Sequence, residues 1–154
     1  MNTKRTLSFI ALALCICIVS LAKAPKYVFY FIGDGMGLNQ VISTQYYLRQ
    51  CEGELGIKPL CFAQFPYTGI ATSYSGSTDV TDSAAGGTAL ATGNKTANGV
   101  IGMKTDKVTP VTSIAEMAHA YGARVGVTTS VTANHATPSS FYAHQKSRND
   151  YYEI

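Results

Sequence analysis

Residues 81–93 are Thr81-Asp82-Ser83-Ala84-Ala85-Gly86-Gly87-Thr88-Ala89-Leu90-Ala91-Thr92-Gly93. We expect a helix here, because Asp82 or Thr81 can cap its first turn and the small side chains let it lie close against a sheet. Ser83 then falls in the first turn, where free backbone N–H groups and the helix dipole favour an oxyanion or a phosphate. Ser83 is therefore a candidate nucleophile, although a capped packing helix could carry such a serine with no chemical role.

A second motif comes earlier, at Tyr27-Val28-Phe29-Tyr30-Phe31-Ile32-Gly33-Asp34-Gly35-Met36-Gly37. An unbroken apolar run that ends in glycines is typical of a buried parallel strand, and it predicts a strand over residues 27–32. Asp34 would then lie at the carboxyl edge of the sheet, where open α/β sheets bind ligands. A carboxylate that leaves an apolar strand needs a cation or hydrogen-bond donors, and a metal ion is the simplest partner.

Two other phosphate-binding motifs fail on spacing. Gly33, Gly35 and Gly37 form G-x-G-x-G, whereas a dinucleotide-binding loop requires G-x-G-x-x-G. The segment that follows Gly87 does not have the G-x-x-x-x-G-K-[ST] spacing of a nucleotide-binding P-loop. The sequence therefore favours neither kind of nucleotide site.

A third segment, residues 132–148, follows a strand-like run at residues 124–131. Thr137 is expected to cap a helix that has Pro138 in its first position. His135 and Thr137 could offer an imidazole and a hydroxyl toward an ion or its waters, and Arg148 could bind an oxyanion. Taken alone, each residue is better explained without a site: His135 as a hydrogen-bonded loop histidine, Thr137 as a capping threonine and Arg148 as a surface arginine. Only their combination with the earlier motifs indicates a site.

Together, the three segments resemble the amino-terminal third of an alkaline phosphatase in their order and approximate spacing. The resemblance rests on Ile32-Gly33-Asp34-Gly35-Met36-Gly37, Asp82-Ser83-Ala84-Ala85-Gly86-Gly87-Thr88-Ala89 and His135-Ala136-Thr137-Pro138 with Arg148. It implies an α/β fold, a three-layer α/β/α sandwich that is truncated here. It also implies hydrolysis of phosphate monoesters through a phosphoserine intermediate, at a site that holds two zinc ions and a magnesium ion.

The same resemblance implies a role for each motif residue. Ser83 would be the nucleophile and would bind a zinc ion that lowers the pKa of its hydroxyl, and Asp34 would bridge that zinc to the magnesium. Thr137 would bind the magnesium. Arg148 would clamp two phosphate oxygens, and Asp82 would position that arginine.

His135 is the ambiguous member of the implied site. The family allows aspartate or histidine at this position, and His135 would lie near the third metal as a ligand or behind ordered water. The family's remaining zinc ligands come from later segments and include an aspartate with a histidine four residues on and an Asp-His pair. Neither pattern occurs here, and the chain has three histidines, His119, His135 and His144. The expected function is therefore that of an alkaline phosphatase represented by an incomplete chain with uncovered apolar surface. The alternative is a non-catalytic remnant or a weak metal- or phosphate-binding module.

Residues 1–24 are predicted to be a secretory signal peptide. Two basic residues precede an apolar run over residues 7–21, and Ala22-Lys23-Ala24 forms a small-x-small cleavage site. The run is shorter than the roughly 20 residues of a membrane-spanning helix, so no stable membrane anchor is expected. Residues 25–154 would form the amino-terminal part of an alkaline phosphatase domain, secreted or periplasmic.

Charge and cysteine content limit the remaining possibilities. The chain has 12 basic and nine acidic residues, and three of the basic residues lie in residues 1–24. A neutral mature chain without a basic run argues against a nucleic-acid partner. Cys51 and Cys61 would form a disulfide in an oxidising compartment or remain buried thiols. A homodimer is possible for a full-length chain.

Overall fold

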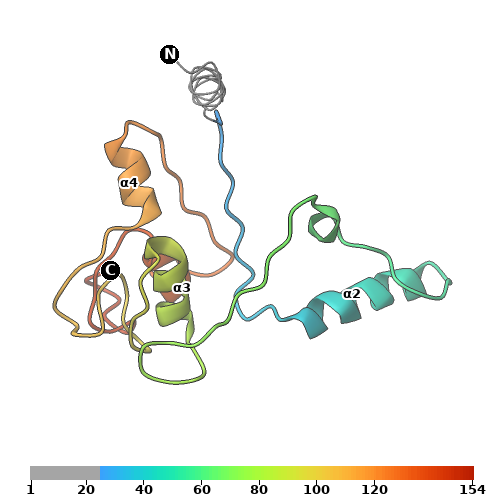
Figure 1. Ribbon diagram of the computed structural model, residues 1–154, viewed down its shortest axis with the longest axis horizontal. Helices are drawn as coiled ribbons and strands as arrows, with labels where there is room; N and C mark the ends of the chain where they lie inside the picture. The colour runs from blue at the N-terminus through green and yellow to red at the C-terminus, as the bar shows by residue number, and fades with distance from the viewer. Residues whose placement is uncertain (1–24) are drawn as a thin grey trace, which may run out of the picture. The chain divides into compact units, whose positions relative to one another are not determined.

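The computed structural model describes residues 25–154, and the predicted signal peptide lies outside the described residues. The chain divides into two units, Met1–Ile32 and Gly33–Ile154. In the first unit the described residues 25–32 form no helix or strand, and in the second unit helices alternate with long irregular segments (Figure 1). No helix in the described part of the chain has the length and apolar character needed to cross a membrane.

Helix α2 (Leu38–Cys51) begins after Gly37, whose N–H donates to Gln40 Oε1 over 3.1 Å. Its one buried residue is Gln45, because this side chain receives the Leu60 N–H at 3.3 Å. The spacing of Leu38, Val41, Ile42 and Tyr46 predicts a helix over residues 38–50 with these side chains on its inward face, and the helix is confirmed. The face that was expected to be inward is exposed, since Leu38, Ile42 and Tyr46 are among the exposed large hydrophobic residues.

The two cysteines lie on separate turns of the segment that contains α2 and the short 3-10 helix η1 (Cys61–Gln64). Cys51 is the last residue of α2, and Cys61 is the first of η1. Both thiols are free and exposed. The disulfide prediction and the alternative of buried thiols are both wrong for this structure.

Helix α3 (Ser83–Thr92) forms where the sequence predicts it. The Asp82 carboxylate accepts the Ala85 N–H at 2.9 Å and so caps the first turn. The helix ends at Gly93, whose φ of 71° is the left-handed conformation that glycine adopts at little cost. Small side chains on its buried face let α3 pack against α4 (Ile114–Ala120) and α5 (Ala136–Ser139).

Helix α5 begins two residues earlier than predicted. Its N-cap is His135, whose carbonyl accepts the Ser139 N–H at 3.1 Å, so Thr137 lies inside the helix and does not cap it. Pro138 is tolerated in the first turn because the N–H groups there have no partner within the helix. The hydrophobic core lies between α3 and α5 and consists of Ala84, Ile101, Ala136 and Ala143, with Ile154 packed against it.

Residues 113–116, Ser-Ile-Ala-Glu, have the pattern of a capping box and predict a helix whose apolar residues face inward, and α4 begins there. The Ser113 side chain accepts the Glu116 N–H at 3.1 Å, and the Glu116 carboxylate accepts the Ser113 N–H at 2.7 Å. The apolar face of α4 was expected to be inward, but Ile114, Met117 and Tyr121 are exposed. The sequence therefore placed the helix correctly and its buried face wrongly.

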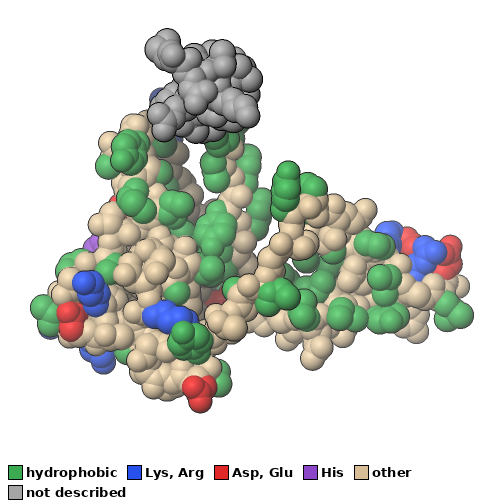
Figure 2. Space-filling model, in the orientation of Figure 1, with side chains coloured by type: hydrophobic (Ala, Val, Ile, Leu, Met, Phe, Trp, Pro, Cys, Tyr) green, Lys and Arg blue, Asp and Glu red, His purple; other side chains and the backbone are tan. Residues whose placement is uncertain are grey.

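The predicted strands are not formed within residues 25–154. Residues 27–32 and 124–131 form no strand, and neither do residues 69–75, where the sequence also predicts a short strand. Two isolated antiparallel bridges, Ile101 with Gln145 and Met103 with Pro110, are the sheet-like pairing within residues 25–154. A strand forms only where a second extended segment pairs with it through backbone hydrogen bonds. The expected uncovered apolar surface is present, as Figure 2 shows in the hydrophobic side chains spread over the molecule.

His144 joins three segments of the second unit. Its Nδ1 lies 2.6 Å from the Gly102 carbonyl oxygen and its Nε2 lies 2.9 Å from Glu116 Oε1. Both partners are acceptors, so both ring nitrogens can donate only in the imidazolium form. Burial favours neutral forms, but the Gly102 carbonyl and the Glu116 carboxylate outweigh it and raise the pKa of His144. The pKa of Glu116 is lowered, because its hydrogen bonds from Ser113 and His144 outweigh burial.

These shifts predict a pH-dependent stability. The contribution of His144 is complete below the ordinary histidine pKa of 6.5 and is lost as the pH rises through the raised pKa. That of Glu116 is complete above 4.5 and is lost as the pH falls through its lowered pKa. Between pH 6 and 9 we expect the wild type to lose about 0.2–1 kcal/mol more free energy of unfolding than His144→Gln, measured in urea.

The control for this prediction is His119→Gln, which removes an exposed histidine from α4, the helix that contains Glu116. It should keep the wild-type decrease between the two pH values. An identical decrease in wild type and His144→Gln would show that the pair does not couple stability to pH.

Gly87 allows the close approach of α3 and α5. A Cβ at this position would lie 2.7 Å from Ser140 Oγ and 3.3 Å from the Thr137 Cα, and the backbone of α5 would have to move. We expect Gly87→Ala to lower the free energy of unfolding by about 1–3 kcal/mol, as overpacked cores do. At Gly86 the new Cβ would meet Thr81 at an ordinary 3.6 Å. Gly86→Ala should be neutral or stabilising by up to about 1 kcal/mol, and equal losses in the two variants would contradict the packing argument.

Candidate active site

The Asp34 carboxylate accepts a hydrogen bond from each of two hydroxyl groups. Ser83 Oγ donates to Asp34 Oδ1 over 3.1 Å, and Thr137 Oγ1 donates to Asp34 Oδ2 over 2.8 Å. Asp34 is exposed in the turn before α2, while Ser83 is the first residue of α3 and Thr137 lies in α5. The packing of α3 on α5 therefore brings the two hydroxyls to one carboxylate, and three of the predicted metal-binding residues lie together.

The Asp82 carboxylate forms the second part of the site. Its Oδ1 caps α3, and its Oδ2 accepts the Gly99 N–H at 3.0 Å and Arg148 Nη1 at 3.1 Å. The side chains of Asp82 and Arg148 are 25% and 28% exposed, so solvent screens the ion pair in part. The Arg148 backbone is also fixed, because its N–H donates to the Gly99 carbonyl over 2.7 Å. Arg148 thus lies beside the residue that precedes Ser83.

His135 is half-buried at the start of α5. Its Nδ1 is buried and has no hydrogen-bond partner in the structure. A buried imidazole nitrogen without a partner is costly, and it suits a water molecule or a cation. The placement of His135 near a bound ion stays a prediction.

The donor atoms at Asp34 suit magnesium better than zinc. One carboxylate and two hydroxyls are oxygen ligands of the kind that hard cations take. Zinc takes three or four ligands, mostly nitrogen or sulfur, and no group of three His, Cys, Asp or Glu side chains that could hold a metal occurs within residues 25–154. The described residues therefore fit part of a magnesium site and do not fit a zinc site.

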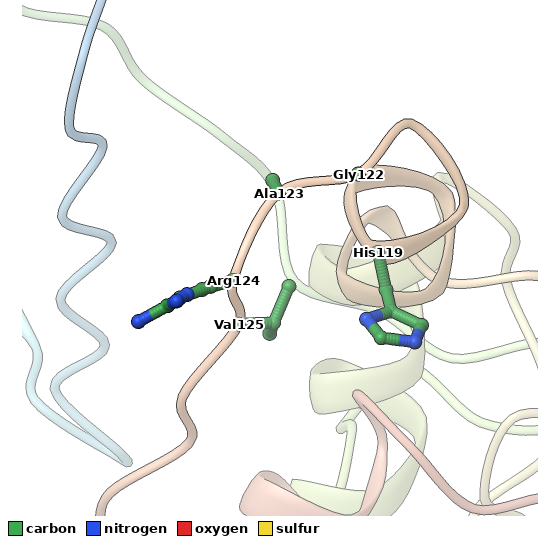
Figure 3. A pocket seen from close by; sticks show the side chains of 5 residues that line it. All are labelled: His119, Gly122, Ala123, Arg124 and Val125. Atoms are coloured by element: carbon green, nitrogen blue, oxygen red, sulfur yellow. The ribbon is translucent and has the colours of Figure 1, made fainter.

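A separate hollow of about 480 Å³ lies at the end of α4. It is lined by His119, Gly122, Ala123, Arg124 and Val125, and in Figure 3 the Arg124 side chain points away from the His119 ring. None of the predicted site residues lines this hollow, and its two polar side chains do not converge. The contacts around Asp34 and Asp82 are the better candidate for chemistry.

Asn98 and Gly99 also belong to this site, although none of the sequence motifs includes them. Asn98 Oδ1 accepts the Asp82 N–H at 3.2 Å, and Gly99 bonds both Asp82 and Arg148 as described above. Asn-Gly is a strong turn signal, and Gly99 has a φ of 80°. The dipeptide could have predicted the turn, but nothing in the sequence relates this turn to Asp82.

Asp82 should matter to stability through its cap on α3. We expect Asp82→Ala to lower the free energy of unfolding by about 1–2 kcal/mol, because the Ala85 and Gly99 N–H groups lose their acceptor. Asp82→Asn keeps an acceptor oxygen for the cap and should lose less than half as much, as measured by urea unfolding. Asp79→Ala, at an exposed position of the same loop, should change stability by less than about 0.5 kcal/mol. Equal losses in Asp82→Ala and Asp82→Asn would show that the cap is not the source.

Comparison with known proteins identifies the relatives of this chain. The family model for alkaline phosphatase matches residues 25–154. Alkaline phosphatase 4 of Drosophila melanogaster is 38% identical over 135 residues, which cover 81% of this chain and 22% of that protein. The human tissue-nonspecific alkaline phosphatase isozyme is 34% identical over 140 residues, which cover 82% of this chain and 26% of that protein. The chain thus spans about a quarter of the length of these relatives.

Solved structures give the same relationship. A cold-active alkaline phosphatase from Shewanella sp. is similar with a TM-score of 0.69 and 40% identity, covering 77% of this chain and 30% of that one. Alkaline phosphatase of the Antarctic bacterium TAB5 has a TM-score of 0.67 and 38% identity, and the match covers 77% of this chain and 32% of that one. A mutant of the TAB5 enzyme has Mg bound in its M3 site, and its TM-score is 0.68 with 38% identity, covering 77% and 32%. These neighbours have an α/β fold.

Proposed function

Because this chain belongs to the alkaline phosphatase family, we propose that residues 25–154 supply the nucleophile and the phosphate clamp for the hydrolysis of phosphate monoesters. The observation that carries the proposal is the Asp34 carboxylate, which receives the hydroxyls of Ser83 and Thr137. The Asp82–Arg148 pair supports it with a cation next to the nucleophile. Asp34, Thr137 and the adjacent His135 are proposed as part of the metal site.

In the proposed reaction Ser83 Oγ loses its proton and forms a bond to phosphorus while the ester P–O bond breaks, and the departing alcohol takes up one proton in exchange. Water then attacks the phosphoserine, releasing phosphate and returning a proton to Ser83. Ser83 begins α3, where the positive end of the helix dipole stabilises the growing negative charge. Asp34 holds the Ser83 hydroxyl in one orientation by accepting its hydrogen bond.

Arg148 is proposed to bind the phosphoryl oxygens. One of its terminal nitrogens is held by Asp82, and no other partner of the guanidinium is found among the described residues. A planar guanidinium that is fixed at one corner can present its remaining donors to two phosphate oxygens. Asp82 is therefore proposed as a positioning residue, which acts on the substrate through Arg148.

A magnesium ion would be held by Asp34 and Thr137, with His135 beside it, and it would supply positive charge next to the phosphate. Zinc remains part of the proposal only with ligands from outside residues 25–154 or from a second chain, because the described donors do not fit it. The three-layer sandwich and a secreted or periplasmic location are also proposed, the former on the similarity to solved α/β structures.

A second candidate function is a non-catalytic module that binds metal or phosphate weakly. It is favoured by the lack of a three-ligand metal cluster in the described part of the chain. Such a module would keep Arg148 and the start of α3 as a phosphate site without turnover.

The deciding experiment measures phosphate release from p-nitrophenyl phosphate by the full chain with zinc and magnesium. We expect Ser83→Ala to lower turnover by a factor on the order of 10³ or more, because it lacks the nucleophile. Ser73→Ala, which removes an exposed serine, is the matched control and should keep wild-type turnover.

The result separates the two candidate functions. Equal background in wild type and Ser83→Ala would contradict the enzymatic proposal. Calorimetric binding of inorganic phosphate by such an inactive wild type, lost in Arg148→Ala, would then support the binding module.

A further inference from the structure

We propose that Asn98 is a positioning residue, which aligns Asp82 and Arg148 for phosphate binding through the Asn98-Gly99 turn. This inference rests on the proposed function of Arg148 as the phosphate clamp. The Asn98 side chain forms its hydrogen bonds with Thr78, Val80 and Asp82, and not with the Ser83 hydroxyl or the Arg148 guanidinium. Its action would be exerted through two neighbouring backbone segments.

The Asn98 side chain uses all of its hydrogen-bonding groups on the loop that leads to Ser83. Its Oδ1 accepts the Asp82 N–H at 3.2 Å. Its Nδ2 donates to the Val80 carbonyl at 3.0 Å and to Thr78 Oγ1 at 3.3 Å. These two donated bonds and one accepted bond fix the path of residues 78–82. Side-chain packing contributes little there, because Val80 is exposed.

The turn also fixes the arginine from the other side. The Gly99 N–H donates to Asp82 Oδ2 at 3.0 Å, and the Gly99 carbonyl accepts the Arg148 N–H at 2.7 Å. Arg148 Nη1 then closes the ring on the same Asp82 oxygen at 3.1 Å. Gly99 sits at a φ of 80°, so the conformation of this turn depends on a glycine there and on the bonds of Asn98 beside it.

The ion pair alone is too weak to hold the guanidinium in place. Both side chains of the pair are exposed by about a quarter, so water screens their attraction and weakens the pair. The backbone bond from Arg148 to Gly99 adds a second point of attachment, and Asn98 holds the turn that provides it. Displacement of a binding group by about 1 Å can cost a factor on the order of 10² in rate, so a loosened turn would affect phosphate binding.

The test uses Asn98→Ala in the full chain, with Asn94→Ala as the matched control. Asn94 is an exposed asparagine that also bonds its own turn, through Nδ2 to the Thr92 carbonyl at 2.9 Å, but it contacts neither Asp82 nor Arg148. If Asn98→Ala does not fold, Asn98→Asp replaces it, because the aspartate keeps an acceptor for the Asp82 N–H and loses the donors to Val80 and Thr78.

Two measurements are made on each variant. Amide hydrogen exchange followed by NMR should be at least about tenfold faster at Asp82 and Arg148 in Asn98→Ala, and unchanged at Met117 in α4. The affinity for inorganic phosphate, measured by calorimetry with zinc and magnesium, should fall about tenfold. Asn94→Ala should match the wild type in both measurements.

A double-mutant cycle with Arg148→Ala separates positioning from general stability. If Asn98 acts through Arg148, the loss of phosphate affinity caused by Asn98→Ala should shrink to less than about twofold when Arg148 is already absent. A loss by the same factor in both backgrounds, or unchanged exchange at Asp82 and Arg148, overturns the positioning role. A wild-type chain that binds no phosphate contradicts the proposed function itself, and with it any role of Asn98 in phosphate binding.

Discussion

The rest of the second unit depends on how the Asp82 carboxylate is held. One oxygen caps α3 through Ala85, and the other binds the Gly99 N–H and the Arg148 guanidinium. The same side chain therefore starts the helix that carries Ser83 and fixes the only cation bonded to that helix start among the described residues. The Asp82 carboxylate therefore links the start of α3 to the Arg148 side chain, and the backbone bond of Arg148 to Gly99 adds a second attachment.

The sequence was a good guide to features that short-range chemistry determines. Capping at Asp82 and Ser113 follows from side-chain oxygens placed just before a helix, and both caps are formed. The contacts of Asp34 with Ser83 and Thr137 join residues that the motifs had marked, although their catalytic and metal-binding roles remain proposals. Local patterns of this kind carry their own physical cause, so they can be found without knowledge of the remaining fold.

Features that depend on distant partners were predicted less well. The apolar faces of α2 and α4 were identified, but a helical pattern does not tell what covers the face, and Ile42 and Ile114 are exposed. The run at residues 27–32 has strand character, yet a strand exists only when a neighbour pairs with it. The start of α5 was misplaced because proline is tolerated anywhere in the first helical turn, so Pro138 does not identify one position.

The contacts of Asp34 also bear on the order in which the molecule folds. Ser83 lies 49 residues from Asp34 along the chain, and Thr137 lies 103 residues from it. Closing loops of this length costs entropy that grows by about 0.6 kcal/mol with each doubling, and hydrogen bonds at an exposed carboxylate return little of it. The α3 cap, which spans three residues, needs no such closure. The carboxylate and its two hydroxyls are thus expected to meet late, after α3 and α5 have packed, so that the site exists only in chains whose second unit has already folded.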